Sequence, residues 1–379
     1  MNFNFCLNAT AVSALLALLA INITRFSPPP PEANFDHWNT EYVPIDGAVG
    51  PESFAFDSSG GGPYTGISDG RIIKWLPQQQ TWIDFAVTSS NRTGCEERER
   101  REEREERCGR PLGLKFKDSG NGDQLYIADA YMGLLRVGSN GGLAERLDFQ
   151  TRDDQLRGFD SLTFANGLDI DQFSGVVYFT DSSSHYQRRN FASSVLSGDN
   201  TGRLMKYDPK TKQLSLLLAN LSFPNGVSLS KNGDFLLLAE TTKCRILKYW
   251  LKTAKAGSYD VIAELPGFPD NIKASRRGGF WVGIHSRKRG SLRLILSYPW
   301  IGKVLLKLPL DIDKVHSFLG KWIKNGGIGM RVSEEGEVME IIEGKGDLKW
   351  KSFSEVEERE DGVVWIGSIN TPFAAKIKM

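Results

Sequence analysis

Histidine and cysteine are scarce in this chain, with 4 of each among 379 residues. In the body of the chain the histidines are His185, His285 and His316. They follow neither a metal-ligand spacing nor the arrangement of a catalytic triad. We therefore expect them at surface or loop positions. His185 and His285, which follow predicted strands, are the two placed to border a pocket.

An excess of charge of one sign is also lacking. The chain has 47 Lys and Arg residues against 46 Asp and Glu residues, which gives a formal net charge of +1. A balanced charge creates no long-range field that would gather nucleic acid or an anionic membrane. We expect no nucleic-acid partner, and membrane contact only through the N-terminal segment.

The apolar run Ala11–Ile23 is too short for a comfortable transmembrane helix, and Arg25 and four prolines at 28–31 follow it. This pattern predicts a signal peptide over residues 1–23, cleaved near Ala20, and a Pro-rich linker over residues 24–43. The alternative is an uncleaved signal anchor, because residues 1–10 contain no Lys or Arg. Either interpretation places the protein in the secretory pathway.

Cysteines in an oxidising compartment can pair, and Cys95, Cys108 and Cys244 lie outside the predicted signal. The tract Glu96–Arg107 separates the first two and has the i,i+4 charge pairs of a solvated helix. A straight helix would hold the two Cα atoms roughly 20 Å apart, whereas a disulfide allows at most about 7 Å. We favour a Cys95–Cys108 disulfide with the tract as a bent surface loop without chemistry, over a helix with separate thiols. Cys244 is then a buried thiol.

In a secreted protein, Asn-X-Ser/Thr tripeptides are acceptor sites for N-glycans, and the chain has two of them. Asn91-Arg-Thr and Asn220-Leu-Ser both lie beside turn signals, whereas Asn370-Thr-Pro lacks the Ser or Thr needed at its third position. We expect glycans on Asn91 and Asn220.

One pattern recurs six times from Glu52 to the end of the chain. In each copy a small or polar residue opens a short alternating strand, a Gly or Asp turn follows, and a second aliphatic strand ends at a small residue. The copies open at Glu52-Ser-Phe, Leu112-Gly-Leu, Asn166-Gly-Leu, Asn225-Gly-Val, Asn271-Ile-Lys and Glu355-Val-Glu. Strand-rich copies at intervals of roughly fifty residues are typical of an all-β six-bladed β-propeller, here over residues 44–379. The longer last interval includes Leu294–Ile323, which is apolar with interspersed Lys, and predicts a small helical insertion between blades five and six. For this stretch we favour an ordinary packed insertion over one that touches a membrane.

Five side chains with oxygen atoms occupy positions that open the innermost strand of a predicted blade. They are Glu52, Asn166, Asn225, Asp270 and Asn271. In a propeller such positions converge at one mouth of the central channel. Carboxylate and amide oxygens without imidazole or thiolate suit Ca²⁺, which takes about six to eight oxygen ligands. The alternative is that the Asn-Gly and Asp-Asn pairs are ordinary turn residues.

Several short strings spread over the chain carry a family resemblance. They are Gly50-Pro-Glu-Ser-Phe-Ala-Phe56, Asp69-Gly-Arg-Ile-Ile73, Cys108-Gly-Arg-Pro-Leu-Gly113, Tyr126-Ile-Ala-Asp-Ala-Tyr131, Phe223-Pro-Asn-Gly226, Leu265-Pro-Gly-Phe-Pro-Asp-Asn271 and Ser354-Glu-Val-Glu-Glu358. This set resembles the plant strictosidine synthase and strictosidine synthase-like family, and it extends over the chain after about Pro44. The resemblance implies a six-bladed propeller, a Cys95–Cys108 disulfide and a vacuolar or endoplasmic reticulum location. The same superfamily contains the calcium-dependent paraoxonases and gluconolactonases, and the five oxygen-bearing residues fall on the metal-ligand positions of the paraoxonase pattern.

The catalytic groups that the resemblance implies are missing or displaced. Strictosidine synthase condenses tryptamine with secologanin, and uses a Glu directly after the Phe that opens the sixth inner strand. Here Ser354 follows Phe353, and Glu355 is one place on, where strand alternation turns it to the other face. A Ser hydroxyl is too weak a base for the proton transfer, although a one-residue gap would restore Glu355. The water-activating His of the paraoxonases would fall near Leu112.

Together these features predict a strictosidine synthase-like protein of the vacuole, the endoplasmic reticulum lumen or the cell exterior, without strictosidine synthase activity. The oxygen-bearing residues, with Ca²⁺ and no nucleotide cofactor, favour hydrolysis of a small-molecule ester or lactone at the channel mouth. Two alternatives stay open. One is a synthase-type condensation in alkaloid biosynthesis with Ser354 or Glu355 at the catalytic position, and the other is a non-catalytic binding propeller.

Overall fold

The structure is a computed structural model that describes residues 40–97, 101–118, 120, 122–151, 162–288, 290–309, 311–312, 326–343 and 352–379. The predicted signal segment over residues 1–23, most of the predicted linker and His316 lie outside these ranges. Within them, no helix has both the length and the apolar character needed to cross a membrane.

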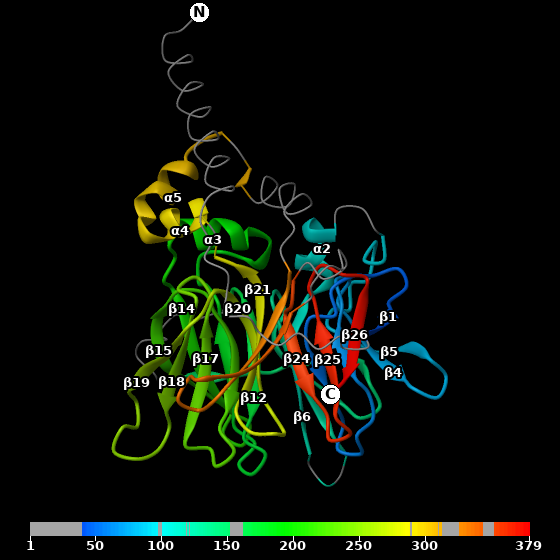
Figure 1. The fold of residues 1–379 in the computed structure, drawn as a ribbon. Helices are drawn as coiled ribbons and strands as arrows, with labels where there is room; N and C mark the ends of the chain where they lie inside the picture. The colour runs from blue at the N-terminus through cyan, green and yellow to red at the C-terminus, as the bar shows by residue number, and fades with distance from the viewer. Residues whose placement is uncertain are drawn as a thin grey trace, which may run out of the picture.

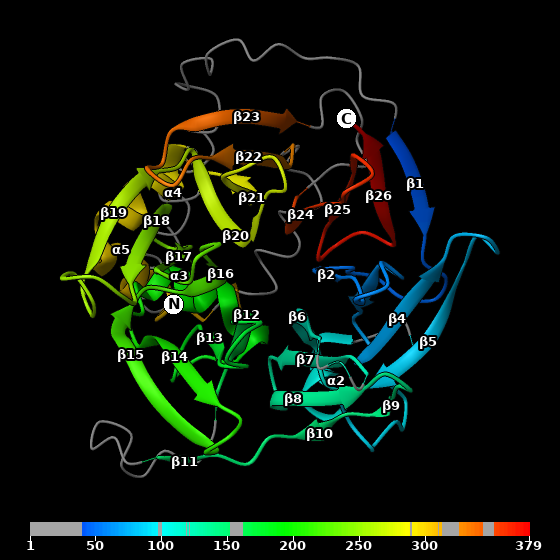
Figure 2. The ribbon, with the colours of Figure 1, turned by 90° about the horizontal axis from the view of Figure 1, so that it is seen from below.

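Six sheets surround a central axis, which confirms the predicted all-β six-bladed propeller (Figure 2). In chain order the blades contain β2 Phe54–Ala55, β3 Tyr64–Gly66, β4 Arg71–Leu76 and β5 Thr81–Val87; β6 Pro111–Lys117, β7 Gln124–Asp129, β8 Gly133–Gly138 and β10 Glu145–Arg146; β12 Ala165–Ile170, β13 Val177–Asp181, β14 Gly202–Asp208 and β15 Gln213–Leu221; β16 Pro224–Leu229, β17 Phe235–Glu240, β18 Arg245–Trp250 and β19 Tyr259–Glu264; β20 Gly267–Ala274, β21 Phe280–Arg287, β22 Ile328–Val332 and β23 Val338–Glu343; and β24 Glu355–Glu358, β25 Val363–Gly367 and β26 Phe373–Lys378. Two short strands, β9 Gly142–Leu143 and β11 Gln150–Thr151, pair in parallel with the outer strands β5 and β15.

The sixth blade is completed by the N-terminal end of the described chain. Strand β1, Thr40–Pro44, pairs antiparallel with β26, so that Thr40 lies opposite Ile377 and Pro44 opposite Phe373. Pairing of the first and last strands closes the circle of blades, because the two ends of the described chain share one sheet. Residues 40–43, which the sequence analysis assigns to the linker, therefore form part of the propeller.

Apolar side chains fill the space between neighbouring blades, and strand β7 shows how alternation achieves this. Its Leu125 and Ile127 belong to the same buried cluster as Ile72 of blade one. Its Tyr126 belongs to a second cluster with Phe179 of blade three. Each blade is thus covered on both faces by its neighbours, which explains why a single blade cannot form a core alone.

All helices of the described chain stand on the face where the inner strands begin (Figure 1). They are α2 Arg101–Cys108, the 3-10 turn η2 Arg188–Asn190, α3 Phe191–Ser197, α4 Gly290–Ser297 and α5 Pro299–Leu305. The predicted helical insertion is present, but α4 and α5 connect β21 to β22 inside the fifth blade. The predicted position between blades five and six is therefore wrong, because β22 and β23, which follow the insertion, are the outer strands of blade five.

Candidate functional site

The structure brings the five oxygen-bearing residues together where the inner strands begin, and we call them the oxygen ring. All of them are buried, with exposed fractions of 2% to 6%: Glu52, Asn166, Asn225, Asp270 and Asn271. The amide of Asn225 donates to Asp270 Oδ1 at 2.7 Å. The amide of Asn166 donates to Ser182 Oγ at 3.0 Å, and this hydroxyl donates to the carbonyl of Pro224 at 2.7 Å. Neighbouring blades are therefore joined around the axis.

The Asn-Gly pairs of the ring lie within strands β12 and β16 and not in turns. A Cβ on Gly167 would lie 2.6 Å from the carbonyl oxygen of Asn225, and a Cβ on Gly226 would lie 2.3 Å from the amide nitrogen of Ile272. These glycines are needed because adjacent inner strands approach too closely for any side chain. The alternative that the pairs are ordinary turn residues is therefore wrong.

Three oxygen atoms of the ring are buried without a hydrogen-bond partner in the described part of the chain. They are Glu52 Oε2, Asn166 Oδ1 and Asn225 Oδ1. Native proteins rarely leave such atoms unsatisfied, because each one destabilises the fold by about 1–3 kcal/mol. Asn271 Nδ2 also lacks a partner, and exchanging O and N of that amide would offer a fourth oxygen. Oxygen atoms of this kind are the donors that a hard cation takes.

The two carboxyl groups of the ring, Glu52 and Asp270, both have raised pKa values. Burial raises the pKa of Glu52 to about 7, while the charges of Arg110 and Arg188 limit the rise. Burial and the charge of Glu52 hold the pKa of Asp270 well above its usual range. Both groups would return to the ionised form beside a divalent cation. Among the described residues, no three His, Cys, Asp or Glu side chains gather as a metal site, so an ion here relies on the amide oxygens.

Ser354 and Glu355, the two candidates for the synthase position, have different surroundings. The hydroxyl of Ser354 donates to the carbonyl of Glu52 at 2.6 Å. The carboxylate of Glu355 accepts from the amide of Phe54 at 2.6 Å and lies 3.5 Å from Lys273 Nζ. Burial raises the pKa of Glu355 to about 8, although the charge of Lys273 opposes the rise. Ser354 is thus a bridge between blades, and Glu355 is enclosed in a buried pair.

The chain matches two family models: that for strictosidine synthase over residues 159–254, and that for the N-terminal part of strictosidine synthase-like proteins over residues 39–75. Strictosidine synthase-like protein 2 of Arabidopsis thaliana is 54% identical over 344 residues, which cover 89% of this chain and 89% of that protein. Strictosidine synthase-like protein 10 of the same plant is 46% identical over 373 residues, 96% of each chain. The chain belongs to the strictosidine synthase-like family.

A more distant likeness concerns the fold of this strictosidine synthase-like protein. A solved gluconolactonase of Xanthomonas campestris superposes with a TM-score of 0.53 over 94% of this chain and 98% of its own. The two sequences are only 13% identical, so the match supports the propeller architecture and says nothing of activity.

Lys273 lies in the channel of this strictosidine synthase-like protein, and the sequence analysis did not single it out. Its ammonium group donates to the carbonyls of Phe54 and Leu114, both at 3.4 Å, in addition to its pairing with Glu355. One side chain of blade five therefore contacts blades one, two and six. The sequence offered only a weak signal, because Lys273 follows Asn271 by two places on the predicted strand, and β20 has an irregular register between Pro269 and Ile272.

An apolar cluster covers the ring side of the mouth. Leu112, Ala130, Phe164 and Phe223 are buried together, with Phe191 and Val195 of α3 among the partly buried side chains packed against them. Phe164 and Phe223 precede Asn166 and Asn225 by two places each, and their rings meet edge to face at 5.3 Å. Leu112, where the paraoxonase pattern would have its His, is part of this apolar wall.

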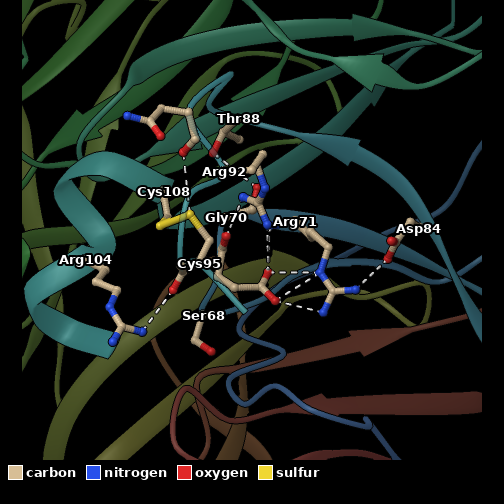
Figure 3. A network of polar contacts seen from close by, with 12 residues as sticks. Ser68, Gly70, Arg71, Asp84, Thr88, Arg92, Cys95, Arg104 and Cys108 are labelled. Atoms are coloured by element: carbon tan, nitrogen blue, oxygen red, sulfur yellow. Dashed lines mark hydrogen bonds and ion pairs between the residues drawn. A yellow bond between two sulfur atoms is a disulfide. The ribbon is translucent and has the colours of Figure 1, made fainter. Parts of the chain in front are cut away.

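The Glu/Arg tract combines both structures that the sequence analysis treated as exclusive. Cys95 and Cys108 form the disulfide, with their Cα atoms 5.7 Å apart, and α2 ends at Cys108 (Figure 3). The described helix covers residues 101–108, and it does not hold the two cysteines apart. Arg104 of α2 donates to the carbonyl of Gly94 at 2.9 Å, which draws the two ends of the segment together.

The same tract contributes Glu105, which is buried, so the expectation of a purely solvated insertion is wrong. Glu105 accepts from Arg188 Nη1 at 2.7 Å and from the hydroxyl of Tyr131 at 3.1 Å, and Arg110 Nε lies 3.9 Å away. These groups surround the mouth near Glu52. Nothing in the repeated Glu and Arg letters distinguishes Glu105 from its neighbours, so the sequence offered no signal for it.

The two described histidines differ in their positions. The His185 side chain is 69% exposed and lies 3.7 Å from Asp199. His285 is half-buried inside β21 and not in a surface loop, and its neighbours Ile284 and Ser286 lie opposite Pro269 and Phe268, directly before Asp270 of the ring. Asn91 and Asn220 are both exposed, as a glycan acceptor must be. Cys244 is buried and free, as expected.

Proposed function

We propose that this strictosidine synthase-like protein hydrolyses a small apolar ester or lactone with the help of a Ca²⁺ ion held by the oxygen ring. The observation that carries the proposal is the set of buried oxygens without partners: Glu52 Oε2, Asn166 Oδ1 and Asn225 Oδ1. Hard oxygen donors of this kind suit Ca²⁺. Bound there, the ion would polarise a carbonyl and increase the acidity of a water molecule.

The class of substrate follows from the wall above the ring. The cluster of Leu112, Phe164 and Phe223 is apolar, and its two phenylalanines precede the ring residues Asn166 and Asn225 by two places each. An apolar wall favours a substrate whose body is apolar, because contact between the two removes apolar surface from water. A single polar carbonyl of that substrate would then contact the ring. Phe191 and Val195 pack against the wall from α3, so entry of a substrate requires α3 to shift.

Strictosidine synthase activity is not expected. The condensation requires a base that removes a proton during ring closure. Ser354 donates its only proton to a backbone carbonyl, and Glu355 is enclosed by Phe54 and Lys273 beneath the ring. Incubation of the protein with tryptamine and secologanin should give no product above a heat-denatured control.

The secretory pathway is the proposed location. The apolar leader over residues 1–23, the Cys95–Cys108 disulfide and the two exposed acceptor asparagines support it. Endoglycosidase treatment of the protein from plant tissue should lower its apparent mass, and Asn91→Gln with Asn220→Gln should abolish that change.

The hydrolase proposal is tested on the purified full chain with a panel of lactones and esters, in Ca²⁺ and in excess chelator. We expect turnover in Ca²⁺ that is lost in chelator and restored by added Ca²⁺. Glu52→Gln preserves volume and should abolish turnover, whereas Glu106→Gln, an exposed carboxyl of α2, should not. A protein that binds Ca²⁺ but turns over no member of the panel would contradict hydrolysis and favour the non-catalytic alternative.

A further inference from the structure

The helical insertion of blade five presents an apolar and basic surface to solvent. Tyr298, Trp300 and Val304 are 52%, 64% and 53% exposed. Arg293, Lys303 and Lys307 are exposed beside them, and residues 290–309 contain no Asp or Glu. We call these six residues the α4–α5 surface.

The opposite side of α5 is tightly packed, which fixes the direction of the exposed side chains. A Cβ on Gly302 would lie 1.7 Å from the carbonyl oxygen of Leu196 in α3. Leu305 is buried on the same side. Trp300 and Val304 are one turn apart, so they share the outer face of the helix. Because Gly302 and Leu305 pack inward, Trp300 and Val304 face solvent.

The α4–α5 surface lies at one end of the molecule. Figure 1 shows α4 and α5 standing above the strands, beside α3. Strand β21 ends at Arg287, opposite the first residue of the inner strand β20, and α4 and α5 follow it at that end. A flat partner could therefore touch these helices without contacting the turns at the other end of the propeller.

We propose that the α4–α5 surface docks on a bilayer that contains anionic lipid. Trp and Tyr are favoured at the boundary between headgroups and acyl chains, and a short amphipathic helix with basic neighbours lies in that plane. The three cations Arg293, Lys303 and Lys307 match a negative headgroup layer, and the first acid that follows them in the chain is Asp311. The net charge of +1 conceals this local concentration of charge, so membrane contact is not confined to the N-terminal segment.

A second copy of the chain fits this surface less well. In a symmetric dimer the same patch meets itself, which would bring Arg293, Lys303 and Lys307 of one copy against the same cations of the other. Like charges in a desolvated interface oppose association. The bilayer avoids this conflict, because its charge is of the opposite sign.

The test uses the full chain in a Cys6→Ser background with an environment-sensitive fluorophore on Val304→Cys. Cys244 is buried and Cys95 and Cys108 are paired, so the introduced thiol is the one that reacts. The matched control carries the label on Phe173→Cys, because Phe173 is 98% exposed in the turn between β12 and β13, at the opposite end of the propeller. Each protein is mixed with phosphatidylcholine vesicles and with vesicles that also contain phosphatidylserine.

We expect the label at 304 to shift to the blue with phosphatidylserine vesicles, and the label at 173 to stay unchanged. Adding Lys303→Glu and Lys307→Glu should weaken the response at 304 by at least about tenfold in lipid concentration. An N-terminal anchor would attach all variants alike, so a response that depends on these two lysines reports on the α4–α5 surface itself.

Three results would overturn the proposal. The first is equal responses at 304 and 173, and the second is a response at 304 that the two Glu substitutions leave unchanged. The third is a label at 304 that is already shielded without vesicles. If that shielding grows with protein concentration, a second copy covers the surface, and if it does not, another segment of the chain covers it.

Discussion

Arg188 Nη1 donates to both carboxylate oxygens of Glu105 at 2.7 Å. This pair joins α2, which belongs to the disulfide-closed segment, to the turn η2 that leads into α3. Glu105 is buried and Arg188 nearly so, and the charge of Arg188 acts on Glu52 of the oxygen ring. A segment that looks like a solvated insertion in the sequence is therefore a structural part of the channel mouth.

Replacing Glu105 by Gln should leave Arg188 as a buried charge without its partner. Breaking a buried pair in this way typically lowers the free energy of unfolding by about 3–5 kcal/mol. The matched control is Glu106→Gln, because Glu106 pairs with Arg189 at 3.1 Å but both side chains are exposed. Exposed pairs contribute about 0–1 kcal/mol. Urea denaturation of the two variants measures the difference, and equal effects would contradict a special role of Glu105.

Removing the disulfide by Cys95→Ser with Cys108→Ser should lower the free energy of unfolding by roughly 3 kcal/mol, the value expected for a closed loop of this size. We also expect coupling to Glu105. Once the loop is open, α2 is held less firmly, so a further Glu105→Gln should have a smaller effect than in the wild type. Denaturation of the single, double and triple variants tests this, and strictly additive effects would show that the loop and the pair are independent.

The stability of the protein should depend on pH through Glu355. Burial raises its folded-state pKa to about 8 from an ordinary value of 4.5, with Lys273 opposing. The folded protein then binds one proton more than the unfolded chain between these two pH values, so stability falls as pH rises through that window. In chelator, the melting temperature of Glu355→Gln should fall less steeply between pH 4.5 and 8 than that of the wild type. Parallel curves would mean that Glu355 is ionised throughout, as a salt bridge with Lys273.

Packing of α5 on α3 should depend on Gly302. A methyl group there would lie 1.7 Å from the backbone of Leu196, which does not yield easily. We expect Gly302→Ala to lower the free energy of unfolding by about 1–3 kcal/mol and to make residues 290–309 more sensitive to protease. Gly138→Ala is the control, because nothing lies within 4 Å of a Cβ at that position. Equal resistance of both variants would show that α5 is not packed in this way.

The residue pattern sufficed for the propeller and for the positions of the oxygen ring. Each inner strand opens at an equivalent place in the repeat, so the sequence predicted that Asn166 and Asn225 lie at the same mouth of the channel. Blade five was only half recognised, because α4, α5 and the residues around them separate β21 from β22. An insertion inside a blade interrupts the spacing on which recognition of a repeat depends.

The groups that surround the ring were beyond the sequence for a different reason. Glu105 and Arg188 are 83 residues apart. Nothing in the sequence indicates which of the many charged residues of the tract is buried and paired in the folded protein. Lys273 is the intermediate case, since its spacing from Asn271 offered only a weak signal of its side of the strand and none of its partners. The repeat in the sequence thus predicts where a residue lies within its blade. Contacts between residues of different blades become known only from the folded propeller.

The most direct test of the account is calorimetric titration of metal-free full-length protein with Ca²⁺, beside Glu52→Gln and Glu106→Gln. The oxygen ring predicts one bound ion per chain, an affinity lowered by at least about tenfold in Glu52→Gln because one ligand charge is removed, and no change in Glu106→Gln. A wild-type protein that binds no Ca²⁺, or one that binds it equally well after Glu52→Gln, would contradict the claim that the ring is a calcium site.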